Sequence, residues 1–186
     1  MNDKFTQLKI KKLHPDAITP TRSHPHDAGL DIYAAESVAL IPQEKHLLST
    51  GIAVDIPPGC VGLLTSRSGV SSKTNLVIET GKIDAGYNGE MKINIKNDEP
   101  MPSPEVDKNN RQMNESFEPL LYNVKGERVE NGNPFNLISG KEYAIEAGDK
   151  IAQLLIVPII TPGVEVVKEF ESESARGTNG FGSTDR

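Results

Sequence analysis

The sequence has no tryptophan, a single cysteine and few aromatic residues, which make up 5% of its 186 residues. One cysteine, Cys60, excludes a disulfide framework within the chain and any cysteine-rich zinc site. No run of about 18 apolar residues is present, which argues against a transmembrane helix, and the N-terminus lacks the basic and apolar pattern of a signal peptide. We therefore expect a cytoplasmic protein with no membrane contact.

The charge and the apolar content narrow the function further. The formal net charge is −6, whereas nucleic-acid binders are usually basic, so we expect no direct nucleic-acid binding. A small anionic ligand stays compatible with this charge, because a local arginine and backbone N–H groups can hold phosphate on an acidic protein. Apolar residues make up only 36% of the chain, and this thin core favours burial of further surface in an oligomer.

Short β-strands dominate the pattern. Residues 91–96 alternate cleanly, with Met91, Ile93 and Ile95 on one face. Further strands are predicted over residues 7–13, 52–56, 60–65, 151–157 and 164–168. Turn signals recur about every 8–12 residues, which is typical of an all-β sandwich or barrel. One short helix is expected after Arg67.

Two regions interrupt this rhythm. Residues 99–140 are rich in proline, glycine, asparagine and charge, so we expect a loop-rich insertion there, with one small hairpin around 119–129 and no core strand. Residues 171–186 form a polar, glycine-rich tail, which we expect to be flexible on its own.

The first motif with chemical content is Ser66-Arg67-Ser68-Gly69, directly after a predicted strand. An arginine, a hydroxyl and N–H groups at a helix start can together bind phosphate. An ordinary serine-rich turn explains the same residues. A nucleophilic role for Ser68 is not supported, because the G-x-S-x-G elbow is missing.

The second motif runs from Gly81 to Glu90 and contains Asp84 and Tyr87. An aspartate in this setting can orient and deprotonate a water, and a tyrosine three residues later can pack against a ring or sugar. A plain β-hairpin, with Asp84 as a turn former, is the competing interpretation.

The third motif, Arg176 to Thr184, combines glycines, hydroxyls, an arginine and Phe181. Successive N–H groups in such a segment can form an anion-binding nest, and Phe181 can stack on a base; a disordered tail is the alternative. Two more segments, Ala28-Gly29-Leu30-Asp31 and Gly148 to Gln153, are each compatible with a simple turn entering a strand.

Taken together and in this order, the five segments resemble the motifs of the trimeric dUTPase family, over about residues 28–98 and 143–184. The resemblance implies a jelly-roll-like β-barrel assembled as a homotrimer, with active sites between subunits. It divides the chain into a core of residues 1–98 and 141–170, an insertion at 99–140 and a C-terminal arm at 171–186. An insertion at this place, between the Gly81–Glu90 and Gly148–Gln153 segments, resembles the staphylococcal phage-type members of the family.

The resemblance also implies the reaction, which is Mg²⁺-assisted hydrolysis of dUTP to dUMP and pyrophosphate; this keeps uracil out of DNA. Asp84 would activate the water that attacks the α-phosphorus, and Tyr87 would pack under the deoxyribose. The hairpin of Gly81, Lys82 and Ile83 would read uracil through backbone groups. Asp31 would anchor the phosphate–metal network through water. The phosphates would be held by Arg67, Ser68, Gly69 and Gln153. From the arm, Phe181 would cap uracil and Arg176, Ser183 and Thr184 would close on the γ-phosphate, and Gly182 would also contact the substrate.

Two departures and two alternatives accompany this assignment. Where many relatives have an asparagine-bearing hairpin strand, this chain has residues 77–80, and its last motif ends Ser-Thr-Asp-Arg. A dCTP deaminase or a bifunctional relative would share the fold. A regulatory role, binding a repressor protein of a mobile genetic element in a bacterial host, is compatible with the enzyme and is a second hypothesis.

Overall fold

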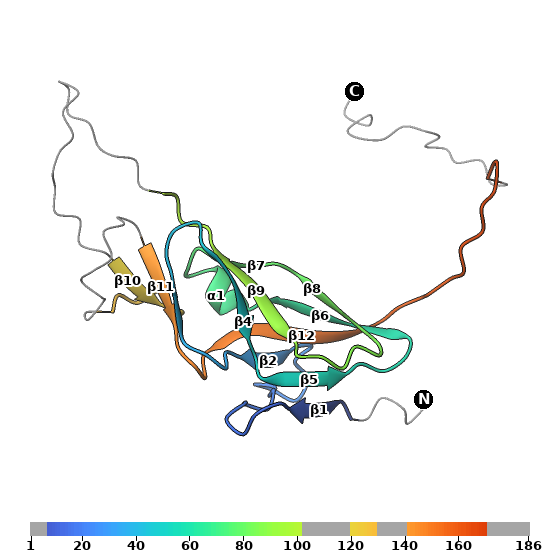
Figure 1. Ribbon diagram of the computed structural model, residues 1–186, viewed down its shortest axis with the longest axis horizontal. Helices are drawn as coiled ribbons and strands as arrows, with labels where there is room; N and C mark the ends of the chain where they lie inside the picture. The colour runs from blue at the N-terminus through green and yellow to red at the C-terminus, as the bar shows by residue number, and fades with distance from the viewer. Residues whose placement is uncertain (1–6, 102–119, 130–140, 171–186) are drawn as a thin grey trace.

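The computed structural model describes residues 7–101, 120–129 and 141–170 (Figure 1). In these residues the strands are β1 (Lys9–Lys12), β2 (Leu30–Tyr33), β3 (Val38–Leu40), β4 (Lys45–Ser49), β5 (Ile52–Asp55), β6 (Cys60–Ser66), β7 (Leu76–Ile78), β8 (Gly81–Asp84), β9 (Lys92–Asn97), β10 (Leu120–Asn123), β11 (Lys141–Ile145) and β12 (Lys150–Pro158). The short helix α1 (Ser68–Ser71) follows Arg67 as predicted. The prediction of an all-β fold is confirmed, and no helix in the described ranges could cross a membrane.

The strands form four small sheets around one core. Their orders are β2-β12-β6-β8, β4-β9-β7, β10-β11-β3 and β1-β5. β12 lies between β2 and β6, so it joins the Ala28–Asp31 segment to the Ser66–Gly69 segment although they are distant in the sequence. This central position of β12 builds the first of the pockets described below.

Strand β9 shows how the alternating pattern becomes a core. Met91, Ile93 and Ile95 are at most 1% exposed, and β9 pairs with β4 on one side and β7 on the other. Each buried isoleucine contributes about 1.5–3 kcal/mol relative to an exposed one. Cys60 is buried in the same core cluster, as expected for a small core residue.

The predicted hairpin at residues 119–129 is present, but it is more than a surface loop. Its strand β10 runs parallel to β11, and Val124 is buried in the core cluster. The turn residue Gly126 has φ +74°, and a Cβ there would lie 2.4 Å from the backbone oxygen of Lys73. The hairpin is therefore an edge addition to the sheet rather than a core strand, and pairing with β11 supplies order that composition does not reveal.

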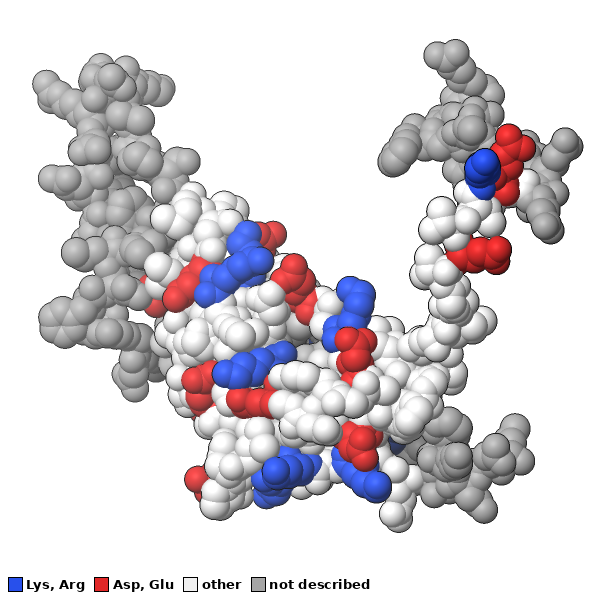
Figure 2. Space-filling model, turned by 45° about the vertical axis from the view of Figure 1, so that its right-hand side comes forward, with Lys and Arg blue, Asp and Glu red and all other residues white. Residues whose placement is uncertain are grey.

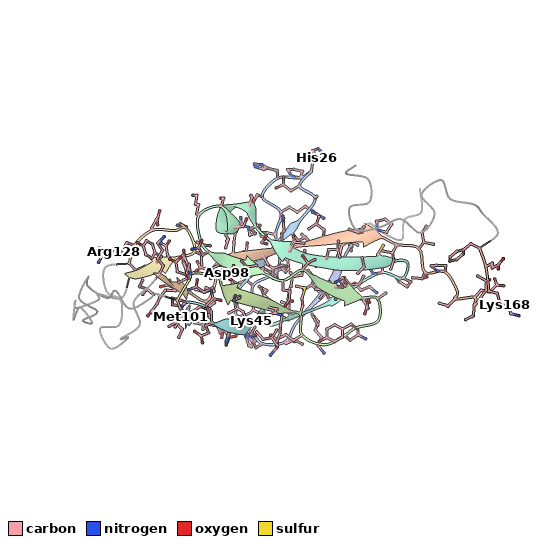
Figure 3. The ribbon with its side chains drawn as sticks, turned by 90° about the horizontal axis from the view of Figure 1, so that it is seen from above. His26, Lys45, Asp98, Met101, Arg128 and Lys168 are labelled. Atoms are coloured by element: carbon pink, nitrogen blue, oxygen red, sulfur yellow. The ribbon has the colours of Figure 1, made fainter. Side chains whose placement is uncertain are left out.

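The strand predicted at residues 164–168 is absent. After Pro158 the chain leaves the body of the molecule without pairing (Figure 1), and Val164 and Val166 are 96% and 95% exposed. An alternating pattern describes a strand only when another strand accepts its hydrogen bonds, and no strand of the described residues does so here. Arg128 of the hairpin and Lys168 of this segment lie at opposite ends of the molecule (Figure 3).

Candidate active site

The first pocket gathers residues from the Ala28–Asp31, Ser66–Gly69 and Gly148–Gln153 motifs. It has a volume of about 330 Å³ and is lined by Ser23, Asp27, Ala28, Gly29, Asp31, Arg67, Ser68, Gly69, Gln153 and Leu155. The register explains the convergence, because Gln153 of β12 is opposite Asp31 of β2 and Thr65 of β6. We refer to it as the Asp31 pocket.

Asp31 is held between two cations. Arg67 Nε donates to Asp31 Oδ1 at 2.8 Å, and Lys150 Nζ and Ser23 Oγ donate to Oδ2 at 2.8 and 3.2 Å. Burial is the largest single influence and raises the pKa of Asp31, but the Lys150 hydrogen bond, the charges of Arg67 and Lys150, and Ser23 together lower it below its ordinary value. Asp31 is therefore a fixed anion that orients the arginine.

Arg67 keeps donors for a ligand after these contacts. Besides the bond to Asp31, its Nη1 donates to the backbone oxygen of Lys150 at 3.2 Å. A guanidinium has five N–H donors, so the remaining donors of Arg67 stay available to an anion.

On the face shown in Figure 2, Lys and Arg side chains are interspersed with Asp and Glu, without a continuous positive surface.

Gly29 and Gln153 form a close pair in this pocket. A Cβ at Gly29 would lie 2.6 Å from Gln153 Oε1, so a larger residue at this position would displace the Gln153 amide. Gln153 Nε2 donates to the backbone oxygen of Ser66 at 3.1 Å, which links β12 to the start of the Arg67 turn. By contrast, a Cβ at Gly69 would meet nothing within 4 Å, so the pocket is open at that point.

Lys150 is a functional candidate that the sequence reasoning missed. Strict alternation would put Lys150 and Gln153 on opposite faces of β12. The register with β2 shifts between Lys150 and Ala152, as in a β-bulge, and this brings the lysine to Asp31. The hydrogen bond with Asp31 raises the pKa of Lys150, despite some opposition from burial. Its position within the Gly148–Gln153 motif was the available signal.

The second pocket contains the residues of the Gly81–Glu90 motif. Its volume is about 400 Å³, and it is lined by Leu47, Lys82, Ile83, Asp84, Tyr87, Glu90, Met91 and Lys92. We refer to it as the Asp84 pocket. Asp84 ends β8, and the backbone N–H of Tyr87 donates to its oxygen at 3.1 Å, which closes a turn over Gly86 at φ +91°. Both predicted side chains are exposed, with Tyr87 at 49%.

The two pockets are separate in a single chain. In the β6–β8 pair, Asp84 lies opposite Val61, whereas Arg67 directly follows the other end of β6 at Ser66. Six residues of extended strand span roughly 20 Å. Gly81 lines neither pocket and lies opposite Leu64, between them. The predicted residues Arg176, Phe181, Gly182, Ser183 and Thr184 fall outside the described residues.

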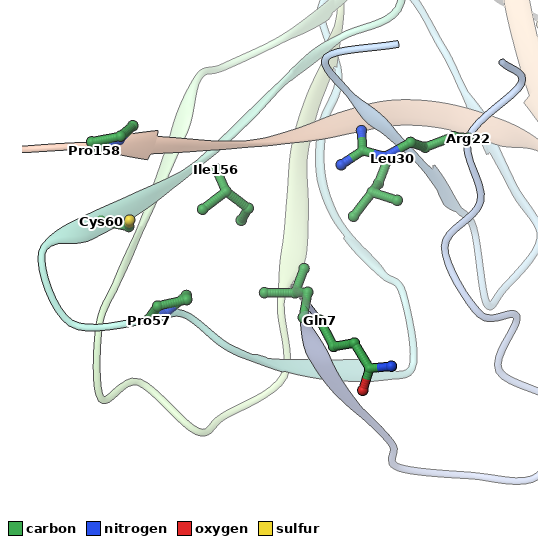
Figure 4. Close-up of a pocket in the computed structure, with 8 residues that line it drawn as sticks. Gln7, Arg22, Leu30, Pro57, Cys60, Ile156 and Pro158 are labelled. Carbon is green, nitrogen blue, oxygen red and sulfur yellow. The ribbon is translucent and has the colours of Figure 1, made fainter. Parts of the chain in front are cut away.

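A third pocket, of about 320 Å³, is mainly apolar and contains none of the predicted site residues (Figure 4). It is lined by Gln7, Leu8, Arg22, Leu30, Pro57, Cys60, Ile156 and Pro158. Arg22 connects it to the Asp31 pocket, because its Nη1 donates to the backbone oxygens of Asp27 and Ala28 at 2.6 and 3.0 Å.

The chain is similar to known proteins in both sequence and fold. The dUTPase family model matches residues 16–102 and 135–185. A deoxyuridine 5'-triphosphate nucleotidohydrolase of Nocardia farcinica is 44% identical over 182 residues, which cover 97% of this chain and 86% of the relative. One of Paramecium bursaria Chlorella virus 1 is 33% identical, with 97% and 99% covered.

Two solved dUTPase structures are similar to this chain in fold. A variant of the Staphylococcus bacteriophage 80alpha dUTPase with dUpNHpp has a TM-score of 0.81 and 50% identity, with 96% of this chain and 98% of that chain covered. The dUTPase of phage phi11 of S. aureus, described with its species-specific insert, has a TM-score of 0.76 and 49% identity, with 90% and 99% covered.

Proposed function

The chain belongs to the dUTPase family and is a dUTP diphosphatase, and on this premise we propose that its two pockets are the two parts of one composite site. The Asp31 pocket holds the triphosphate, and the Asp84 pocket receives the nucleoside and supplies the water-activating carboxylate. The observation that carries the proposal is their separation along β6 and β8 within a single chain.

A complete site then requires more than one subunit. The roughly 20 Å of strand between Asp84 and Arg67 exceeds the length of a triphosphate chain. One subunit therefore contributes Asp84 and another contributes Arg67, in a homotrimer with three shared sites. The exposed apolar side chains of Leu47 at 57% and Val77 at 50%, and those of residues 159–170, support burial against neighbouring subunits.

In the chemical step, the Asp84 carboxylate accepts a proton from water as the water oxygen attacks the α-phosphorus. The bond from that phosphorus to the bridging oxygen breaks, which releases pyrophosphate and dUMP. Arg67 stabilises the charge that develops on the phosphates. Tyr87 packs against the deoxyribose and excludes a 2′-hydroxyl, while the backbone of Gly81 to Ile83 reads uracil. The arm of residues 171–186 closes over the bound nucleotide.

The residues of the Asp31 pocket fit a magnesium ion held indirectly. Both Asp31 oxygens already accept hydrogen bonds from protein donors, and the described ranges contain no cluster of three metal-ligating side chains. Such a donor set suits Mg²⁺ bound mainly by phosphates and waters, with Asp31 contacting it through water. When bound, the ion would neutralise phosphate charge. A structural Mg(II) ion is described in a phi11 dUTPase variant.

Substrate selection tests the activity. Pyrophosphate release should be measured with dUTP, dTTP, dCTP and UTP in the presence of Mg²⁺, and ammonia release with dCTP. We expect efficient turnover of dUTP alone and no ammonia. Ammonia release from dCTP would instead identify the deaminase alternative.

Subunit mixing tests the composite site. Arg67→Ala and Asp84→Asn subunits should each be nearly inactive alone. Unfolded together and refolded as mixed trimers, they should regain activity, because some sites then combine an intact Arg67 with an intact Asp84. No regain in mixed trimers confirmed by mass would contradict sharing of these two residues.

A regulatory role is a second candidate. The Staphylococcus bacteriophage 80alpha dUTPase is described as one of the phage dUTPases that control transfer of virulence genes. This similarity supports the proposal that the present chain binds a repressor protein of a mobile genetic element. The family model leaves residues 103–134 unmatched. Because these residues are additional to the matched dUTPase core, we propose that they contact the repressor. Capture of such a repressor should be compared between the intact chain and a variant with residues 103–118 replaced by a short linker. The variant keeps the hairpin because Val124 belongs to the core; equal capture would exclude the replaced segment.

A further inference from the structure

Asp84 ends β8 and Tyr87 lies in the loop that leads from β8 to β9, and both side chains are largely exposed. The loop closes at Glu90, which ends the second sequence motif and to which neither the sequence analysis nor the mechanism gives a role. Glu90 is half-buried, and it makes contacts from its carboxylate and from its backbone. These contacts decide where the loop lies.

The Glu90 carboxylate attaches the loop to the turn between β4 and β5. Oε1 accepts hydrogen bonds from the Ser49 hydroxyl and from the backbone N–H of Gly51, the latter at 2.9 Å. Oε2 lies 3.5 Å from Lys92 Nζ. Burial is the largest single influence and raises the pKa of Glu90, but the hydrogen bonds from Ser49 and Gly51 and the charge and hydrogen bond of Lys92 outweigh it and lower the pKa.

The turn that receives Glu90 is itself fixed. The backbone N–H of Ser49 donates to Glu36 Oε1 at 2.7 Å, and Ala35 N–H donates to the Ser49 oxygen at 2.8 Å. Thr50 is 2% exposed, and its hydroxyl donates to the Met91 oxygen. Gly51 has φ +66°, a backbone conformation that residues other than glycine rarely adopt, and in this conformation its N–H donates to Glu90.

The other end of the link is the Tyr87 ring. Tyr87 Oη donates to the backbone oxygen of Glu90 at 3.0 Å. A Cβ at Gly89 would lie 2.5 Å from Tyr87 Oη, so the ring rests directly against this glycine. The position of the ring therefore depends on the position of the Glu90 backbone, which in turn depends on the carboxylate anchor.

We propose, on the basis of the proposed function, that Glu90 is a positioning residue that fixes Tyr87 and thereby sets selection of deoxyribose over ribose. Without the carboxylate, the Gly51 N–H and the Ser49 hydroxyl lose their acceptor and the loop loses its attachment. A ring displaced by about 1 Å no longer excludes the 2′-hydroxyl, and displacements of this size change rates substantially.

The test compares kcat/KM for dUTP and UTP in the wild type, Glu90→Ala and Glu90→Gln. We expect Glu90→Ala to lower the dUTP/UTP ratio about tenfold. Glu90→Gln should recover most of it, because the amide oxygen can still accept from Gly51 N–H. The matched control is Glu44→Ala, since Glu44 is also half-buried and accepts from a backbone N–H, that of Ile41 at 3.0 Å, away from the loop.

The outcomes separate this proposal from the proposed function. A wild type that does not prefer dUTP contradicts the function itself. A preference that survives in folded, trimeric Glu90→Ala overturns the role of Glu90, as does an equal loss in the Glu44 control. If Glu90→Ala does not fold, Ser49→Ala takes its place: it removes one of the two donors to Oε1, so a smaller fall in the ratio supports the proposal and an unchanged ratio overturns it.

Discussion

The Asp31 pocket and the Asp84 pocket hold their residues by different means. In the Asp31 pocket two cations, Arg67 and Lys150, share one anion, Asp31, and the three form a connected set across three strands or turns. In the Asp84 pocket the Asp84 and Tyr87 side chains are exposed, and Glu90 attaches their loop to the turn between β4 and β5. The Asp31 pocket therefore presents fixed positive charge to a ligand, whereas the Asp84 pocket exposes its carboxylate and its tyrosine ring.

Under the proposed division of the site, this difference matches what each pocket would bind, which is a triphosphate in the Asp31 pocket and a nucleoside in the Asp84 pocket. A triphosphate needs positive charge already in place, since rearranging charges during binding would weaken the electrostatic stabilisation. In the proposed composite site, one subunit binds the phosphates and another receives the nucleoside. The Asp84 pocket therefore needs an open surface that can face the neighbouring subunit. Variants in the Asp84 pocket should therefore affect mainly kcat, and variants in the Asp31 pocket should affect nucleotide binding as well.

Asp84→Asn should have the largest effect. The amide cannot accept the proton of the attacking water, so kcat should fall by about 10²–10⁴ while dUTP binding is largely kept. Steady-state kinetics together with calorimetric titration of a non-hydrolysable dUTP analogue would measure both quantities. Asp55→Asn, at an exposed aspartate at the end of β5, is the matched control and should be neutral. Turnover near the wild-type rate in Asp84→Asn would remove Asp84 from the mechanism.

Arg67→Ala should come next, with a loss of about 10²–10³ in kcat/KM. In contrast to Asp84→Asn, it should also weaken analogue binding, because the main donor to the phosphates is gone. Arg67→Lys restores the charge but not the planar fork and should recover only part of the loss. If the analogue binds Arg67→Ala as tightly as the wild type, the two pockets do not divide binding and chemistry as proposed.

Sequence patterns predicted the parts of the molecule whose order is local. Alternation located β9, and the Ser66–Gly69 and Gly81–Glu90 segments each contribute residues to the lining of one pocket. The anchor Glu90 was missed because its partner Ser49 lies 41 positions away, and a glutamate in a turn gives no local sign of such a contact.

The hairpin at 119–129 and the wrongly predicted strand at 164–168 show why local composition misleads in these two segments. Val124 belongs to the core although its surroundings are polar, whereas Val164 and Val166 alternate as in a strand yet are exposed. In each case the outcome depends on a pairing partner, which is β11 for the hairpin and absent from the described part of the chain for residues 164–168. Tertiary context overrides propensity at such positions.

Lys150→Met should have a smaller effect than either change above. Lys150 contacts Asp31 and not the predicted ligand positions, so its loss acts by loosening Arg67. We expect kcat/KM to fall about tenfold, the lower end of the effect of residues that orient binding groups. Lys150→Arg should restore most activity, because it again donates to Asp31. Equal defects in Lys150→Met and Lys150→Arg would indicate a packing role instead.

The smallest effect should be on acid stability, and it tests whether the Asp31 pocket is held by charge. The pKa of Asp31 in the folded protein lies below its ordinary value of 3.8, so its contribution to the free energy of unfolding is fully present above that pH. The contribution is lost as the pH falls through the lowered pKa. The stability difference between the wild type and Asp31→Asn, measured by urea unfolding, should therefore be constant from pH 7 to pH 5 and shrink towards pH 3. A difference that stays the same down to pH 3 would mean that Asp31 acts through packing, and the contrast between the two pockets would then lose its electrostatic basis.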